Sequence, residues 1–267
     1  IADKWAHVFN FEGGGASFNS GVSCKLIDGN RGMITASQVE ENINPPDFYH
    51  SPLTSLVCLE NTTNKGGGAC YDFSEIQKIR SVCDKHHLGL HLDGARIWNA
   101  LVFKNEDPKI YGEVFDTISV CLSKGLGAPV GSVLIGRNEF MDKAMRIRKV
   151  LGGGMRQVGF MAAAGIYALD NNIQRLKEDH IRALEISNAL SKLSYIKKVE
   201  PTETNIVIFY LSDNISEKTF LNALQQNNVR ISSMGQGKLR IVTHLDYTPE
   251  MHHEFLNILN EDLLSSF

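Results

Sequence analysis

Short apolar runs that end in polar turns recur along the first half of the chain. We expect strands over the runs at residues 53–59, 88–92, 117–122 and 130–135. Each run has the length of a strand, and a helical pattern lies between the first two. Residues 1–30 lack periodicity and predict loops and short strands. The alternation that follows them predicts a mainly parallel sheet covered by helices.

Capping residues stand before two helical patterns in this half of the chain. Thr35 and Gln38 have the spacing of a capping box and predict a short helix toward Asn44. Asp72 and Glu75 have the same spacing and predict the start of a longer helix. The apolar stripe of that helix consists of Ile76, Ile79, Val82 and Cys83.

The second half of the chain begins with helical patterns and then alternates between strands and helices. We expect helices over residues 161–169, 173–193 and 217–227 and from residue 249 onward. We expect strands over residues 205–211, 229–232 and 239–243. Thr248 and Pro249 are typical of the start of the last helix. We therefore expect a larger α/β domain over residues 1–175 and a smaller C-terminal α/β domain over residues 176–267.

The composition favours a globular protein and gives no sign of nucleic-acid binding, membrane binding or a disulfide framework. The chain has 267 residues, 43% of them hydrophobic, which is enough for a substantial core. A net charge of −3 offers no basic field for nucleic acid or a membrane surface. The five cysteines are scattered, which favours unbridged thiols in a reducing cytosol over disulfides or a zinc site. No apolar run has the length of a membrane span, so we expect a cytoplasmic protein.

Candidate chemistry lies where two of the predicted strands end. Asp93 follows the run at 88–92, and Lys124 follows the run at 117–122. Open α/β sheets bind ligands beyond the carboxyl ends of their strands. A lysine that forms a Schiff base and a carboxylate that keeps a pyridine nitrogen protonated are what pyridoxal 5'-phosphate (PLP) requires. From spacing alone, the alternatives are a surface lysine in a turn for Lys124 and an ordinary Asp-Gly turn for Asp93.

Segments along nearly the whole chain resemble the threonine aldolases, a PLP-dependent family of the aspartate-aminotransferase fold superfamily. The matching segments are Ala6-His7-Val8 with Glu12-Gly13-Gly14, Leu59-Glu60-Asn61-Thr62, and residues 91–99, 121–131, 152–169 and 240–246. Their number and common order make the resemblance specific. It implies a large domain of PLP fold type I with a mainly parallel sheet, followed by the smaller α/β domain.

The resemblance also implies roles for residues near the cofactor. Lys124 carries PLP as an aldimine, and Asp93 holds the pyridine nitrogen. Arg96 lies by the ring hydroxyl and the substrate carboxylate. His7 stacks over the ring and reaches the substrate hydroxyl. Taken without the resemblance, His7 is an ordinary surface histidine and Arg96 a salt-bridged surface arginine.

Two further arginines gain roles from the resemblance. Arg156, which follows three glycines at the expected start of a helix, contacts the cofactor phosphate from a neighbouring subunit. The alternative for Arg156 is a solvated side chain on a flexible hinge. Arg240, expected at the end of a strand, clamps the substrate α-carboxylate. A homodimer or homotetramer with shared active sites follows.

The chain departs from the family pattern at one site position. Thr63 stands where many members have a histidine after Glu-Asn-Thr. The acceptor of the β-hydroxyl proton is therefore open between His7 and a bound water, with Thr63 as a hydrogen-bonding partner of the hydroxyl. We also expect that the N-terminal part of the family fold, with its phosphate cradle, is absent from this chain.

The reaction that the resemblance implies is retro-aldol cleavage of L-threonine or L-allo-threonine to glycine and acetaldehyde. The same cofactor supports other outcomes, so β-elimination and transamination remain alternatives. A catalytically inactive homologue that serves as an oligomer partner is a further alternative.

Overall fold

The computed structural model describes residues 1–260 and divides the chain after Ile173. One unit covers Ile1–Ile173, and the second begins at Gln174. The predicted boundary lies two residues further along the chain, at residues 175 and 176. The assignment of the first unit as the cofactor-binding domain stays a prediction. Among the described residues, no helix is both long enough and apolar enough to span a membrane.

The described residues of the first unit form a four-stranded sheet with the order β3-β4-β5-β6. Its strands are β3 (Leu56–Glu60), β4 (Gly89–Gly94), β5 (Thr117–Cys121) and β6 (Ser132–Gly136). The first three are parallel, and β6 runs antiparallel to β5. The predicted mainly parallel sheet is therefore confirmed.

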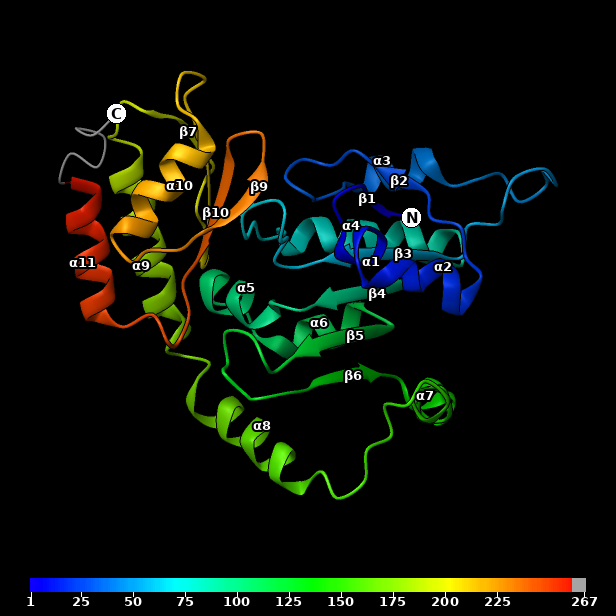
Figure 1. The fold of residues 1–267 in the computed structure, drawn as a ribbon. Coiled ribbons are helices and arrows are strands. Elements are labelled where there is room, and N and C mark those ends of the chain that lie inside the picture. Colours follow the sequence, from blue (N-terminus) through cyan, green and yellow to red (C-terminus); the bar gives the residue numbers. More distant parts are fainter. Residues whose placement is uncertain (261–267) are drawn as a thin grey trace. The chain divides into compact units, whose positions relative to one another are not determined.

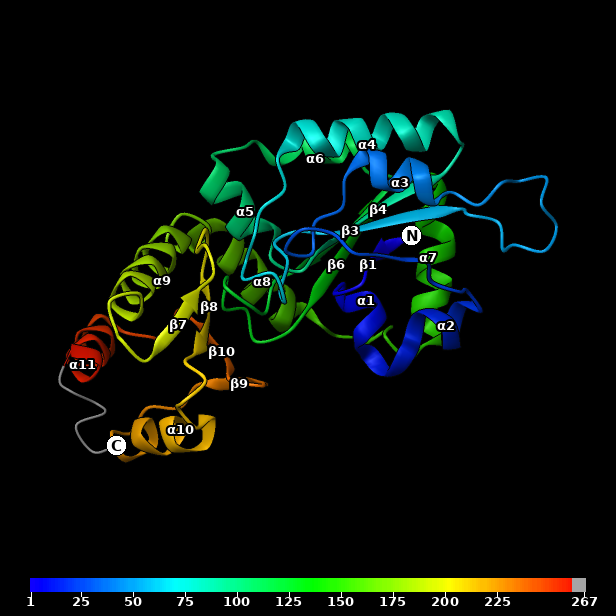
Figure 2. The ribbon, with the colours of Figure 1, turned by 90° about the horizontal axis from the view of Figure 1, so that it is seen from above.

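Helices cover this sheet on the side where apolar side chains emerge. They are α4 (Phe73–Lys85), α5 (Ile97–Lys104) and α6 (Pro108–Val114), preceded by α3 (Ala36–Asn42). Figure 2 shows α4 and α6 along one side of the sheet, and α1 and α2 on the other. In β4, Leu90 and Leu92 are fully buried and join Ile76 and Ile79 of α4 in one core. Because strand side chains alternate, Asp93 lies on the opposite face.

The two predicted capping boxes have different outcomes. Thr35 and Gln38 form the full reciprocal cap of α3, as predicted. The cap predicted for α4 is wrong, although the helix itself forms. Asp72 instead pairs with Lys104 Nζ at 2.6 Å, and Glu75 accepts the Ala36 N–H at 2.8 Å. Partners brought close by packing have replaced the local cap.

The expectation of only loops and short strands over residues 1–30 is wrong for residues 7–20. The elements there are β1 (Ala2–Asp3), α1 (His7–Asn10), a 3-10 turn at Glu12–Gly14, α2 (Gly15–Ser20) and β2 (Leu26–Ile27). No residue of α1 or α2 is buried, so neither helix has an apolar stripe that periodicity would reveal.

Two helices follow β6, and the sequence predicted only one of them. The unpredicted helix is α7 (Asn138–Val150), and α8 (Gly159–Asn171) covers the alanine-rich run. At the end of α8, Asn172 Nδ2 donates a hydrogen bond of 2.7 Å to the Leu126 carbonyl, which lies in the loop after β5. This bond ties α8 to the loop that carries Lys124.

The second unit is an antiparallel sheet with helices on one face (Figure 1). Its elements are α9 (Leu176–Leu190), β7 (Ile196–Val199), β8 (Ile206–Leu211), α10 (Glu217–Gln226), β9 (Ser232–Gly235), β10 (Lys238–Val242) and α11 (Pro249–Asn260). Alternate residues Val207, Phe209 and Leu211 of β8 share one core with side chains of α9, α10 and α11. β7 was not predicted, and β9 begins three residues later than the predicted strand.

A half-buried ion pair between Arg80 and Asp116 joins α4 to the segment that leads into β5. Asp116 Oδ2 accepts the Leu90 N–H at 2.8 Å and contacts Arg80 Nη1 at 2.9 Å. Burial alone raises the pKa of the Asp116 carboxyl, but the Leu90 N–H and the Arg80 guanidinium outweigh it and hold the pKa below its usual value. The charged form of Asp116 therefore stabilises the fold.

We predict that Asp116→Asn lowers the free energy of unfolding by about 1–3 kcal/mol at neutral pH, because it weakens the contacts of a half-buried carboxylate with the Leu90 N–H and Arg80. A lowered pKa contributes stability that is present above the unfolded pKa and lost as the pH falls through the folded pKa. The difference in the free energy of unfolding between Asp116→Asn and the wild type therefore shrinks below about pH 4. Urea unfolding at several pH values measures this, with Asp142→Asn, a change on the exposed face of α7, as the control.

Candidate active site

Asp93 lies near the carboxyl end of β4, between side chains of the two neighbouring strands. The register places it beside Glu60 of β3 and Ser119 of β5. Asp93 is half-buried, and its Oδ1 accepts the Ala95 N–H at 3.1 Å. At Gly94 an added Cβ would lie 2.7 Å from the Ser119 carbonyl oxygen, so only glycine allows this close approach.

Lys124 lies in the turn that follows β5. Its side chain is exposed, and its Nζ contacts Cys121 Sγ at 3.6 Å. Since β4 and β5 are adjacent and parallel, their carboxyl ends meet at one edge of the sheet. The structure therefore brings the loops of Asp93 and Lys124 to the same edge.

His7 begins α1 and is held from two sides. Its backbone N–H donates to Glu60 Oε2 at 2.7 Å, next to Asp93 in the sheet. Its ring Nε2 lies 2.7 Å from Glu12 Oε1. The ring stacks on Phe11 with centroids 4.6 Å apart. His7 thus belongs to the same sheet edge, and its stacking partner here is a phenyl ring.

Thr63 is buried behind this edge, 2% exposed. Its hydroxyl donates to the Arg31 carbonyl at 2.8 Å, and its N–H donates to the Ala69 carbonyl at 3.0 Å. The hydroxyl hydrogen is thus committed to the backbone. The expected contact of Thr63 with the substrate hydroxyl stays a prediction, in which the Thr63 oxygen can only accept a hydrogen bond.

The two arginines of the first unit occupy different surroundings. Arg96 is half-buried at the residue before α5, three positions after Asp93. Arg156 is exposed in the bend before α8, which begins only at Gly159, so the expected helix start at Arg156 is wrong. No hydrogen bond or ion pair of residues 1–260 joins Arg156 to Asp93 or Lys124.

Arg240 belongs to the second unit. It lies in the middle of β10, opposite Ile208 of β8 and Ser232 of β9, rather than at the strand end as predicted. An arginine inside a paired strand has its backbone position fixed by neighbours on both sides.

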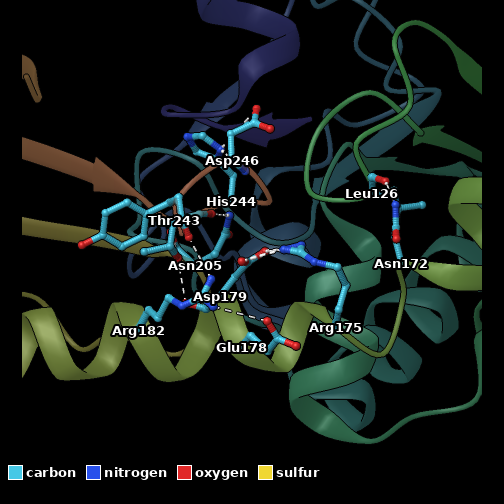
Figure 3. Close-up of polar contacts among 11 residues, drawn as sticks. Leu126, Asn172, Arg175, Glu178, Asp179, Arg182, Asn205, Thr243, His244 and Asp246 are labelled. Carbon is cyan, nitrogen blue, oxygen red and sulfur yellow. Dashed lines mark hydrogen bonds and ion pairs between the residues drawn. The ribbon is translucent and has the colours of Figure 1, made fainter. Parts of the chain in front are cut away.

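A buried polar network that the sequence did not reveal anchors the end of β10 (Figure 3). Thr243 Oγ1 donates to the Asp179 carbonyl of α9 at 2.7 Å, and Asn205 Nδ2 donates to the Thr243 carbonyl at 2.9 Å. The Asp179 carboxylate accepts two hydrogen bonds of 2.8 Å from Arg175. Burial raises the pKa of Asp179 although Arg175 opposes the change. The network fixes where the strand of Arg240 ends.

Comparison with known proteins places this geometry in a family. A family model described as beta-eliminating lyase matches residues 1–214. The probable low-specificity L-threonine aldolase 2 of Arabidopsis thaliana is 35% identical, over 98% of this chain and 73% of that protein. The chain belongs to the threonine aldolases of the beta-eliminating lyase family. The low specificity L-threonine aldolase of Escherichia coli (strain K12) is 36% identical, over 94% of this chain and 73% of that protein.

Solved structures confirm the fold class of this threonine aldolase family member. A putative L-allo-threonine aldolase of Listeria monocytogenes has a TM-score of 0.82 at 20% identity, covering 98% of this chain and 74% of its own. The threonine aldolase of Leishmania major has a TM-score of 0.82 at 22% identity, and the match covers 98% of this chain and 77% of that one. At these identities the likeness establishes the PLP fold type I architecture alone.

The residues at the sheet edge fit PLP, the cofactor of this family. An exposed primary amine follows β5, and a half-buried carboxylate ends the neighbouring β4. These groups suit the aldehyde and the pyridine nitrogen of the cofactor respectively. Glu60, whose carboxylate holds the segment of His7 beside Asp93, is a residue that the sequence analysis missed. An acidic residue at the end of the apolar run 53–59 was the available signal.

We predict that borohydride reduction of the PLP-loaded chain, followed by peptide mapping, marks Lys124. Lys124→Ala removes the mark and lowers turnover by several orders of magnitude, since no other amine replaces it. Lys149→Ala, a change on the exposed face of α7, keeps the mark and serves as the control. A mark on Lys149 or Lys65 in the wild type contradicts the assignment.

Proposed function

We propose that this protein is a PLP-dependent aldehyde-lyase that cleaves L-threonine or L-allo-threonine to glycine and acetaldehyde. One observation carries the proposal: Asp93 and Lys124 lie at the carboxyl ends of adjacent parallel strands in a member of this family. The relatives' names supply the substrate class, as low-specificity L-threonine aldolases.

The first group of residues would hold the cofactor. Lys124 would bind the PLP aldehyde through its amine, and Asp93 would keep the pyridine nitrogen protonated by charge. Bound PLP supplies an electron sink for the charge that the broken bond leaves on Cα. Arg96, which is half-buried three residues after Asp93, would meet anionic oxygen of the ring or of the substrate.

The second group would handle the substrate. Retro-aldol cleavage needs a base for the β-hydroxyl proton, and we assign that role to His7. Glu12 faces Nε2 of His7, so the neutral ring carries its proton there and keeps Nδ1 as the acceptor. Phe11 stacks on the ring and restrains its rotation. Arg240 would clamp the α-carboxylate with its planar guanidinium fork.

We further propose that the protein is a homodimer or homotetramer with shared active sites, located in the cytoplasm. Arg156 would reach the cofactor phosphate of the partner. Exposed apolar side chains near Arg156 support an interface, because Val150 is 84% and Phe160 91% exposed. The exposed Ala162 and Ala163 of α8 allow close helix packing.

We predict that Asp93→Asn folds normally but loses most aldolase turnover, because an amide cannot hold a pyridinium by charge. Acetaldehyde release from L-threonine measures the reaction. The exposed Asp213→Asn is the control and keeps wild-type rates. Near-normal turnover in Asp93→Asn assigns Asp93 to structure. Release of a keto acid in place of acetaldehyde by the wild type favours β-elimination or transamination.

We predict that mixing Lys124→Ala and Arg156→Ala subunits restores part of the activity. In a two-fold assembly with shared sites, a mixed dimer has one site with both changes and one with neither. Turnover before and after verified subunit exchange measures the recovery. A fully active monomer by light scattering, or no recovery after exchange, contradicts shared sites.

A further inference from the structure

We infer that Glu60 is a positioning residue for His7, because its buried carboxylate fastens the segment of His7 to the sheet edge that carries Asp93. Glu60 ends β3 and is 7% exposed. In the parallel register it lies directly beside Asp93 on the same face of the sheet. The inference rests on the proposed role of His7 as the base.

Both oxygens of Glu60 are used, and they hold two different segments. Oε2 accepts the His7 N–H at 2.7 Å, across 53 positions of sequence. Oε1 accepts the Asn64 N–H at 2.7 Å, in the turn that also carries Thr63. Hydrogen bonds to an ionised acceptor are short and stronger than neutral ones. One side chain therefore fixes the backbone of two segments that carry predicted site residues.

This geometry requires a carboxylate. Two N–H donors face two oxygens, so a glutamine at this place satisfies one donor and turns its own NH2 group toward the other. A buried N–H that faces another donor is destabilised. Burial raises the pKa of Glu60, the two backbone N–H groups oppose that change, and the neighbouring Asp93 adds to it. The fold keeps a carboxylate here although burial and Asp93 both disfavour its charge.

His7 is thereby restrained at two independent points. Glu60 holds its backbone, and Glu12 faces its ring. The ring partner sets the orientation of the imidazole, whereas the backbone contact ties His7 directly to the strand beside Asp93. A displacement of about 1 Å at a reacting group lowers rates by about a hundredfold. Loss of the Glu60 contact therefore reduces kcat while Lys124 and Asp93 stay in place.

The test compares the full-length, PLP-loaded wild type with Glu60→Gln and Glu60→Asp. We expect kcat to fall by about tenfold to a hundredfold in both, with borohydride labelling of Lys124 retained. The imidazole NMR signals of His7, assigned through their loss in His7→Ala, shift in both variants. Unchanged kcat and unchanged His7 signals overturn the inference, and so does loss of the folded state in both variants, which assigns Glu60 to stability.

A double-mutant cycle separates positioning from a general structural effect. If Glu60 acts through His7, adding Glu60→Gln to His7→Ala lowers kcat no further. An equal loss in both backgrounds contradicts the inference. If the wild type shows no aldolase turnover, the proposed function fails. The His7 signals still report whether Glu60 holds the histidine, so the two failures are distinguishable.

Discussion

The parallel register of β3, β4 and β5 is the constraint on which the candidate active site depends. It places Glu60, Asp93 and Ser119 in one row and brings the turn of Lys124 to the same edge. The residues before them in each strand alternate into the core beneath α4, which sends the polar row to the opposite face. A shift of one residue in β4 would send Asp93 into that core.

The sheet edge concentrates acidic groups, and the fold compensates each in a different way. Asp93 is half-buried and accepts the Ala95 N–H. Glu60 is buried and is satisfied by two backbone donors. Glu12 is exposed and meets His7. A half-buried carboxylate such as Asp93 suits a cationic ligand, while Glu60, whose two oxygens both accept backbone N–H groups, suits holding the backbone.

The second unit positions its candidate arginine by other means. Arg240 is held inside an antiparallel strand, and the Thr243 network fixes the end of that strand against α9. The Asp179 carboxylate in this network is fully buried and pairs with Arg175 through three hydrogen bonds. Backbone pairing and a satisfied polar cluster together leave the position of Arg240 little freedom.

The sequence by itself determined the four strands of the first sheet and the helices α3, α4, α8, α9, α10 and α11, because these follow from runs of apolar residues, helical periodicity and capping residues. It also identified Asp93 and Lys124, since polar residues at the ends of apolar runs mark the binding edge of a parallel sheet. It did not reveal α1, α2, α5, α6, α7 or β7. The contact of Glu60 with His7 spans 53 positions, and that of Asp72 with Lys104 spans 32. Only the tertiary structure decided such pairs, because packing brings together donors and acceptors that no local pattern relates.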